Sequence, residues 1–251
     1  MDDNQRLHQM RAVVTGGATG IGEAIARVFS QNGAQVLTVD LPDSGVEQQF
    51  ARVNGIEGRV LDVSGDDAPE AIVSMAQDTL GGVDILVNNA GISSFETVEK
   101  SSDELWDTVM ANNLRPVFRL SRALLPMLKK SPAGRIINLG SIYSIFGQTG
   151  LSAYVASKHA VAGLTKSMAS EVGRYGITVN YIQPGAIMTD MTREPFRQRP
   201  DLRDYWIKKA SVGRLGEPLD VAKVALFLAT DDAAFVTGTG IVVDGGAVQK
   251  P

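Results

Sequence analysis

Short apolar runs alternate along this chain with segments whose apolar residues recur at the spacing of a helix. The apolar runs predict seven strands, at residues 12–14, 34–39, 58–62, 83–88, 135–139, 177–182 and 241–243. Helical spacing predicts helices at about 21–29, 71–80, 102–129, 153–168 and 218–229. Because the strands are apolar on both faces and alternate with helices, we predict a doubly wound α/β fold, with about seven parallel strands and helices on both faces of the sheet.

Composition limits the possible partners. No linker divides the 251 residues, so we predict one domain over 1–251. The chain carries 24 basic and 28 acidic residues, a formal charge of −4, and no basic run, so neither nucleic acid nor membrane is an expected partner. There is no cysteine, and the two histidines, His8 and His159, are far apart, so no metal site is expected. The acidic, polar N-terminus and the lack of a long apolar run indicate a soluble, cytoplasmic protein.

A glycine-rich turn follows the first predicted strand and opens the first predicted helix. Its glycines are Gly16, Gly20 and Gly22, a G-x-x-x-G-x-G spacing that differs from the common G-x-G-x-x-G. Glycine lets backbone N–H groups and the positive end of a helix approach a pyrophosphate, which a Cβ would block. The position of the turn therefore predicts a dinucleotide site.

One acidic residue at the end of the second strand bears on which dinucleotide binds. Asp40 follows Gly20 by 20 residues, where a carboxylate can accept hydrogen bonds from an adenosine ribose. A 2′-phosphate there would meet a negative charge, and neither Thr19 nor Leu41 is basic. The sequence favours NAD over NADP, although Asp40 taken alone also fits an ordinary strand-end acid.

Tyr154 and Lys158 are four residues apart on the helix predicted at 153–168, so they share one face. A phenol has a pKa of about 10, and a tyrosine that works as an acid or base at neutral pH needs positive charge beside it. Lys158 and an oxidised nicotinamide could supply that charge. The spacing alone also occurs by chance on many helices.

Together these motifs resemble the short-chain dehydrogenase/reductase family over residues 11–246. Residues 15–22 resemble its TGxxxGxG turn, 88–91 its NNAG segment and 154–158 its YxxxK motif. Ser141 precedes Tyr154 by the usual thirteen positions, and residues 184–189 resemble the PGxxxT that follows strand six. The resemblance implies a Rossmann fold and an NAD-dependent oxidoreductase that interconverts a secondary alcohol and its ketone.

The resemblance also implies the roles of individual residues. The catalytic residues would be Asn113, Ser141, Tyr154 and Lys158: Tyr154 as general acid or base, Lys158 on the nicotinamide ribose, Ser141 on the substrate oxygen and Asn113 anchoring a relay water. The implied cofactor-binding residues are Gly16, Thr19, Gly20, Ile21, Gly22, Asp40, Asp62, Val63, Asn89, Ala90, Gly91, Tyr154, Lys158, Pro184, Gly185, Ile187 and Thr189.

Asn113 has support of its own, because it interrupts the apolar stripe of its predicted helix. A buried amide needs hydrogen-bond partners, which a water or the protein core could supply. Its neighbour Asn112 is the other candidate, and the family's Asn-Leu order selects Asn113. Pro116 replaces the family's usual small residue and deprives the Asn112 carbonyl of its helical partner, so we expect a bend there that exposes backbone oxygens to the relay water.

The substrate is the least determined feature. Residues 188–213 would form a lid rich in methionine, aromatic and arginine side chains, and Tyr143, Phe146 and Gln148 could form the opposite wall. These side chains favour a cyclic or aromatic alcohol or ketone, with a sugar or polyol as the alternative, but they could equally pack only the lid. A non-catalytic NAD-binding sensor is the alternative of another class. By resemblance we expect a homotetramer that pairs the long helices around Asn113 and Tyr154.

Overall fold

The computed structural model describes residues 5–250; residues 1–4 and 251 of the predicted domain lie outside the described part. Seven parallel strands form one sheet in the order β3-β2-β1-β4-β5-β6-β7. The strands are β1 (Arg11–Thr15), β2 (Gln35–Asp40), β3 (Ile56–Val60), β4 (Ile85–Asn88), β5 (Arg135–Leu139), β6 (Thr178–Pro184) and β7 (Gly240–Val243). The predicted doubly wound α/β fold is confirmed.

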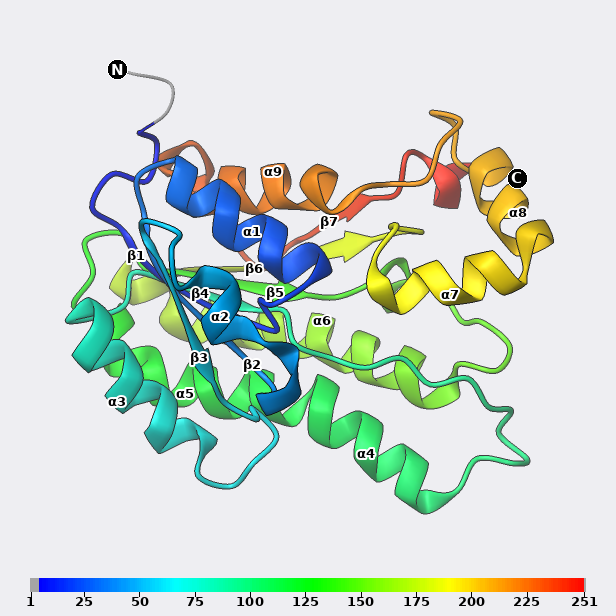
Figure 1. Cartoon of the computed structure of the whole chain (residues 1–251), viewed down its shortest axis with the longest axis horizontal. Helices are drawn as coiled ribbons and strands as arrows, with labels where there is room; N and C mark the ends of the chain where they lie inside the picture. Colours follow the sequence, from blue (N-terminus) through cyan, green and yellow to red (C-terminus); the bar gives the residue numbers. More distant parts are fainter. Residues whose placement is uncertain (1–4, 251) are drawn as a thin grey trace.

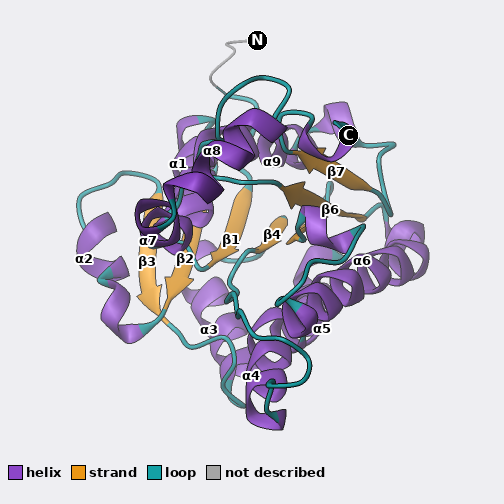
Figure 2. Cartoon of the chain, turned by 90° about the vertical axis from the view of Figure 1, so that its right-hand side faces the viewer, coloured by secondary structure: helices purple, strands orange, loops and turns teal. Residues whose placement is uncertain are grey.

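Helices cover both faces of the sheet (Figures 1 and 2). They are α1 (Gly20–Gln31), α2 (Val46–Phe50), α3 (Ala68–Leu80), α4 (Asp103–Asn113), α5 (Arg115–Leu128), α6 (Ser152–Val172), α7 (Asp190–Gln198), α8 (Pro200–Lys209) and α9 (Pro218–Ala229). The pair α1 and α9 packs on one face, while α3, α5 and α6 pack on the other (Figure 1). In the described residues, no helix is both long and apolar enough to cross a membrane.

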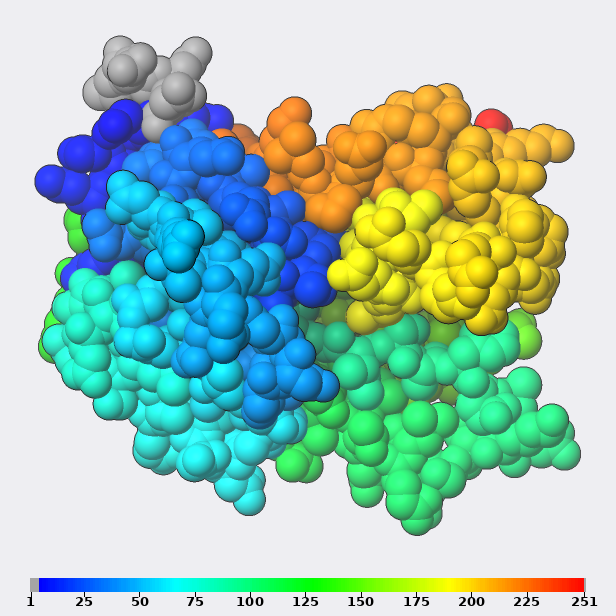
Figure 3. All heavy atoms as spheres, in the orientation of Figure 1, coloured from blue at the N-terminus to red at the C-terminus, as the bar shows by residue number. Residues whose placement is uncertain are grey.

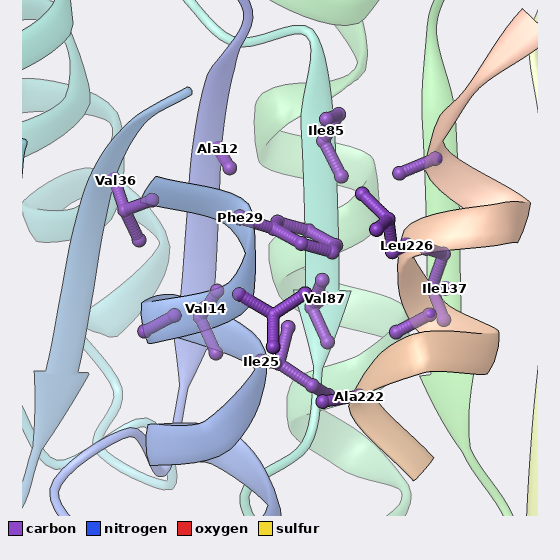
Figure 4. Close-up of a cluster of buried hydrophobic side chains, with 14 of the residues drawn as sticks. Ala12, Val14, Ile25, Phe29, Val36, Ile85, Val87, Ile137, Ala222 and Leu226 are labelled. Atoms are coloured by element: carbon purple, nitrogen blue, oxygen red, sulfur yellow. The ribbon is translucent and has the colours of Figure 1, made fainter. Parts of the chain in front are cut away.

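Two apolar layers hold these helices to the sheet. On the α1 and α9 side, Phe29 and Ile25 of α1 lie over β1 and β4 and meet Leu226 of α9 (Figure 4). On the other side, Ile72 of α3 and Leu124 of α5 are fully buried against the sheet. Burial of each such side chain stabilises the fold by about 1.5–3 kcal/mol, which explains why the strands are apolar on both faces.

The strand order turns round between β1 and β4, so the connections after these two strands leave in opposite directions. In open α/β sheets this point leaves a crevice at the carboxyl ends of the strands, where ligands bind. The segments after β1, β2, β4, β5 and β6 all meet there. Chain connectivity therefore brings the motifs of the sequence to one edge of the sheet.

Several predicted boundaries are wrong. The helix predicted at 102–129 is two helices, because Leu114 (φ −118°, ψ −50°) separates α4 from α5. The interruption lies two residues before Pro116, which occupies the first turn of α5, where no N–H is needed; the bend itself stays a prediction. The third strand begins at Ile56, two residues before the predicted start, and α2 was not predicted. The predicted lid contains two helices, α7 and α8, which form one side of the surface in Figure 3.

Candidate active site

A cavity of about 320 Å³ opens at the carboxyl ends of the strands. All of the residues predicted to bind the cofactor line it, with the exception of Gly22. Ser141, Tyr154 and Lys158 line the same cavity, whereas Asn113 does not. Segments that lie far apart in the sequence, from Gly16 to Thr192, thus line one cavity.

The glycine turn after β1 has the geometry that an anion site requires. Gly16 and Gly20 have φ values of +65° and +57°, a region that side chains with a Cβ rarely adopt. A Cβ on Gly22 would lie 2.0 Å from the Gly16 carbonyl oxygen, which accounts for this third glycine although it does not line the cavity. Asn89 fixes the turn by donating to the Thr15 and Gly16 carbonyls at 2.9 and 2.8 Å.

Asp40 lies at the edge of the cavity where β2 ends. Its carboxylate accepts hydrogen bonds from the backbone N–H groups of Ala18 and Leu41, both at 2.8 Å. Within residues 5–250, Lys158 is the one basic side chain that lines the cavity, and it lies on α6 with Tyr154. The end near Asp40 therefore carries an acid and no nearby base.

A second acid, Asp62, follows β3 and lines the cavity together with Val63. One oxygen of its carboxylate accepts hydrogen bonds from the N–H and hydroxyl of Ser64, at 2.9 and 2.7 Å. The loop beyond it is held by Arg119 of α5, which donates to the Gly65 carbonyl at 3.1 Å. The loop after β3, which carries two of the residues predicted to bind the cofactor, is thus fixed by contacts with the rest of the fold.

Lys158 lies in the second turn of α6, with its ammonium nitrogen 5.5 Å from the centre of the Tyr154 ring. This ammonium donates to the Leu139 carbonyl at 2.8 Å and is 5% exposed. Ser141 begins a 3-10 turn, η2 (Ile142–Ser144), and its hydroxyl accepts from the N–H of Tyr143 at 3.2 Å. These contacts bring a phenol, an ammonium and a hydroxyl together around the cavity.

Burial dominates the electrostatics of this group. It raises the pKa of the Tyr154 phenol above 10, and the hydrogen bond with Ser141 offsets only part of that rise. It also lowers the pKa of the Lys158 ammonium to about 8, since the charged form loses solvation. In the chain alone the ammonium is directed to the Leu139 carbonyl, and burial is the largest effect on the tyrosine pKa, so a lowering of that pKa by Lys158 stays a prediction.

Asn113 is buried, and its side chain is hydrogen-bonded to two other segments of the protein. Its side chain is 1% exposed; it accepts from the Ile92 N–H at 2.8 Å and donates to the Ile92 carbonyl at 2.9 Å and the Ser157 hydroxyl at 3.1 Å. The amide therefore has its partners within the protein, the second of the two possibilities left open by the sequence. Its neighbour Asn112, which was not selected, is the asparagine that lines the cavity. Because Pro116 has no N–H, the Asn112 carbonyl lacks the usual helical donor. A relay water remains a prediction.

After β6, Ile187 and Thr189 line the cavity at the base of the lid. Thr192, which sequence reasoning missed, holds this segment: its hydroxyl donates to the Ile187 carbonyl at 2.6 Å and accepts from the Thr189 N–H at 2.9 Å. The signal was available, since Thr189 and Thr192 have the spacing of a capping box at the start of α7. Other lining residues that were missed are Val39, Leu41, Leu61, Ile92, Leu139 and Gly140, while Asp190 and Met191 lie in the predicted lid.

The lid residues divide between packing and exposure. Phe196 is 6% exposed and packs the lid, whereas Met191 and Tyr205 are 52% and 53% exposed. On the facing wall, Tyr143 makes edge contacts with the rings of Phe146 and Tyr154, with centroids 5.4 and 6.3 Å apart. Burial raises the pKa of the Tyr143 phenol to about 12, and Tyr154 and Tyr205 add to the rise. Aromatic groups therefore lie beside Tyr154.

The arginines of the lid are paired with neighbouring acids. Arg193, Arg197, Arg199 and Arg203 contact Asp190, Glu194, Asp201 and Asp204, respectively. These pairs are exposed, so each contributes little to stability, but each reduces the positive potential of the lid. In the described part of the chain, no group of three or more His, Asp or Glu side chains could hold a metal ion.

Comparison with known proteins defines the class. The family model described as enoyl-(acyl carrier protein) reductase matches residues 16–248. The 3-oxoacyl-(acyl-carrier-protein) reductase FabG of Vibrio cholerae is 40% identical over 237 residues, covering 94% of this chain and 96% of that protein. The FabG of Pseudomonas aeruginosa is 42% identical over 240 residues, with the same coverage of both chains. The chain belongs to the short-chain dehydrogenase/reductase family and is an oxidoreductase of that family.

A solved structure supports the same assignment. The ligand-free aldohexose dehydrogenase of Thermoplasma acidophilum superposes with a TM-score of 0.91 at 30% identity, covering 98% of this chain and 97% of that one. The relatives therefore act, by their names, on two different kinds of substrate: a 3-oxoacyl group carried by a protein, and a sugar.

Proposed function

We propose that this protein is an NAD-dependent oxidoreductase that interconverts a secondary alcohol and its ketone. The observation that carries the proposal is a single cavity with Ser141, Tyr154 and Lys158 at one end and Asp40 at the other. A bound nicotinamide would accept hydride from the alcohol carbon or deliver it to the ketone carbon. The glycine turn, where a Cβ on Gly22 would be blocked, fits a dinucleotide pyrophosphate.

The residues of the chain handle the proton and the substrate oxygen. In the oxidation direction Tyr154 takes the hydroxyl proton of the alcohol, and in reduction it returns a proton to the ketone oxygen. The Ser141 hydroxyl donates a hydrogen bond to the substrate oxygen and stabilises charge that develops there. Lys158 orients the nicotinamide ribose and holds positive charge beside the phenol. This charge favours the phenolate once the substrate and cofactor exclude water.

Asp40 supports NAD over NADP. A 2′-phosphate about 5 Å from the carboxylate would be destabilised by about 3 kcal/mol at an effective dielectric constant of 20. No basic side chain lines that end of the cavity in residues 5–250. The ratio of kcat/KM for NAD and NADP tests this point, and an equal or higher value for NADP would reject it.

The aromatic mouth supports a substrate with a cyclic or aromatic group next to the reacting carbon. Tyr143 lies edge-on to the Tyr154 ring, and Phe146, Met191 and Tyr205 are exposed nearby on the wall and lid. Two other substrate classes follow from the relatives: a 3-oxoacyl thioester and an aldohexose or polyol. The mouth favours the cyclic or aromatic substrate over the sugar, because apolar side chains gain little from contact with a hydroxylated sugar.

One panel of substrates separates these candidates. Purified protein is mixed with NAD or NADH and with aromatic and alicyclic alcohols and ketones, a short 3-oxoacyl thioester, and aldohexoses. Nicotinamide absorbance is then followed. Highest kcat/KM for the aromatic or alicyclic compounds supports the proposal, whereas preference for the thioester or the sugar assigns the corresponding relative's chemistry. No turnover on any compound, together with NAD binding by calorimetry, would favour a non-catalytic sensor.

We further propose a homotetramer and a cytoplasmic location. Trp106 of α4 and Phe118 of α5 are 44% and 45% exposed, which supports pairing of these helices between subunits. Light scattering gives the mass in solution, and a monomer would reject the tetramer.

A further inference from the structure

Two buried serines connect the reacting groups to one another, and neither belongs to the catalytic set described above. Ser144 ends the η2 turn and is 8% exposed, while Ser157 lies in α6 and is 0% exposed. Neither side chain lines the cavity. What they can do is hold the residues that line it.

Ser144 links Ser141 to Lys158. Its hydroxyl donates to the Lys158 carbonyl at 2.8 Å and accepts from the Ser141 N–H at 3.2 Å. The ammonium of the same lysine donates to the Leu139 carbonyl at 2.8 Å. Lys158 is therefore attached at both ends to the segment that begins with the end of β5 and carries Ser141.

Ser157 makes the corresponding link for Tyr154. Its hydroxyl donates to the Tyr154 carbonyl at 2.7 Å and accepts from the Asn113 amide at 3.1 Å. Asn113 in turn bonds to both backbone groups of Ile92, which lines the cavity. The turn of α6 that carries Tyr154 is thus attached to the cavity wall after β4.

A serine in a helix often bonds to a carbonyl one turn earlier with no further consequence. These two hydroxyls differ, because each also bonds to another element of the site: Ser157 accepts from the Asn113 amide, and Ser144 donates to the Lys158 carbonyl of α6. Each hydroxyl therefore fixes the distance between two elements rather than only satisfying its own helix.

We propose that Ser144 and Ser157 are positioning residues. Ser144 fixes the position of Ser141 relative to Lys158, and Ser157 fixes the position of Tyr154 relative to Asn113 and Ile92. The inference rests on the proposed function, since it concerns the geometry of the same reaction. Displacement of a catalytic group by about 1 Å can lower a rate by about 10²-fold, so loss of either link acts on turnover more than on cofactor binding.

The test compares Ser144→Ala and Ser157→Ala with Ser121→Ala. Ser121 is the matched control, because its hydroxyl is also buried and accepts a hydrogen bond, from the Asn88 amide at 3.1 Å, but it contacts no catalytic residue. We expect kcat to fall by about 10-fold or more in the first two variants, with the KM for NAD within about 2-fold, and kcat to stay near wild type in the control. Ser144→Thr, which keeps the hydroxyl, restores most of the lost kcat.

A second measurement does not depend on the substrate. The titration of Tyr154 is followed by tyrosinate absorbance, as the difference between each protein and the same protein carrying Tyr154→Phe. Because the Ser141 hydrogen bond lowers the pKa of this phenol, we expect Ser144→Ala to move the midpoint to higher pH. Ser121→Ala leaves it unchanged.

The outcomes separate this inference from the proposed function. If wild type turns over no substrate, the proposed function fails and the tyrosine titration alone decides the role of Ser144. If Ser144→Ala and Ser157→Ala match Ser121→Ala in both kcat and titration, the positioning role is rejected. Should an alanine variant not fold, Ser144→Cys and Ser157→Cys keep the volume, weaken the hydrogen bonds and are judged by the same two outcomes.

Discussion

The carboxylate of Asp40 accepts a hydrogen bond from the backbone N–H of Ala18 at 2.8 Å, so the acid that ends β2 is fixed against the glycine turn. The other carboxylate oxygen accepts from the Leu41 N–H, also at 2.8 Å. With both oxygens held by backbone groups, the negative charge has a fixed place at the cavity edge. Asp40 is therefore suited to discriminate between dinucleotides by charge as well as by hydrogen bonding.

Replacing this acid should relax the discrimination. In Asp40→Ala we expect the ratio of kcat/KM for NAD to that for NADP to fall by about 10²-fold, the equivalent of the repulsion of about 3 kcal/mol proposed above. Steady-state kinetics with both dinucleotides measures the ratio. Asp43→Ala, a change at an exposed acid three residues further on, is the control and should keep it. An unaltered ratio in Asp40→Ala would mean that the ribose lies elsewhere.

Tyr154→Phe removes only the phenol oxygen that we propose carries the proton. We expect turnover to fall by about 10²-fold or more, because general acid–base catalysis contributes about that much. The Kd for NAD from calorimetry should stay near wild type, since the ring remains in place. Tyr175→Phe, at a tyrosine that is 40% exposed and packs against Lys129, serves as the control. Turnover within a few-fold of wild type in Tyr154→Phe would contradict the assigned role.

Hydrophobic patterning predicted the sheet well because a parallel sheet covered on both faces needs strands that are apolar throughout. It failed where local geometry outweighed periodicity. The stretch 102–129 keeps helical spacing across its whole length, yet the helix is interrupted at Leu114. Pro116 cannot donate a hydrogen bond to the carbonyl of the residue four positions before it. Helix α7 is mostly polar, and α2 spans only five residues, too few for helical periodicity to show in the sequence.

The residues of the candidate site that belong to sequence motifs could be predicted. Gly20, Asp40 and Tyr154 all line one cavity, and the order of motifs along the chain was enough to expect that. What could not be predicted was which side chains hold the motifs. Ser144 and Ser157 act through hydrogen bonds with the Lys158 carbonyl and the Asn113 amide, and such contacts depend on tertiary distances that leave no periodic trace in the sequence.

Gly22→Ala tests the cradle of the glycine turn. The added methyl would lie 2.0 Å from the Gly16 carbonyl and 2.5 Å from the Asn89 amide, so the turn must shift. We expect the Kd for NAD to rise by about 10-fold or more, since close approach of the backbone to the pyrophosphate is lost. Gly163→Ala in α6, where nothing lies within 4 Å of the new methyl, is the matched control and should bind NAD like wild type. Equal Kd values for both variants by calorimetry would contradict the proposal that Gly22 lets the backbone of the turn approach the pyrophosphate.

The last prediction concerns stability away from the site. Arg11 at the start of β1 donates from Nε and from a terminal guanidinium nitrogen to the two carboxylate oxygens of Asp84, both at 2.8 Å. Burial raises the pKa of Asp84, but hydrogen bonds from Arg11 and Ser131 outweigh it, so this pKa lies below its ordinary value. The carboxylate therefore stabilises the fold above the unfolded pKa of about 3.9, and that contribution is lost as pH falls through the lower folded pKa.

Asp84→Asn should accordingly lower the free energy of unfolding by about 2 kcal/mol at neutral pH, because it leaves the Arg11 guanidinium with a weaker partner. Denaturant unfolding of wild type and variant between neutral pH and pH 3 measures the difference, and we expect it to shrink below about pH 4, where the unfolded carboxyl is already protonated. Glu194→Gln, which breaks an exposed pair with Arg197, is the control and should show no such dependence. If the difference in free energy of unfolding between wild type and Asp84→Asn stays constant across this range, packing rather than the charge on Asp84 stabilises the contact between β1 and β4.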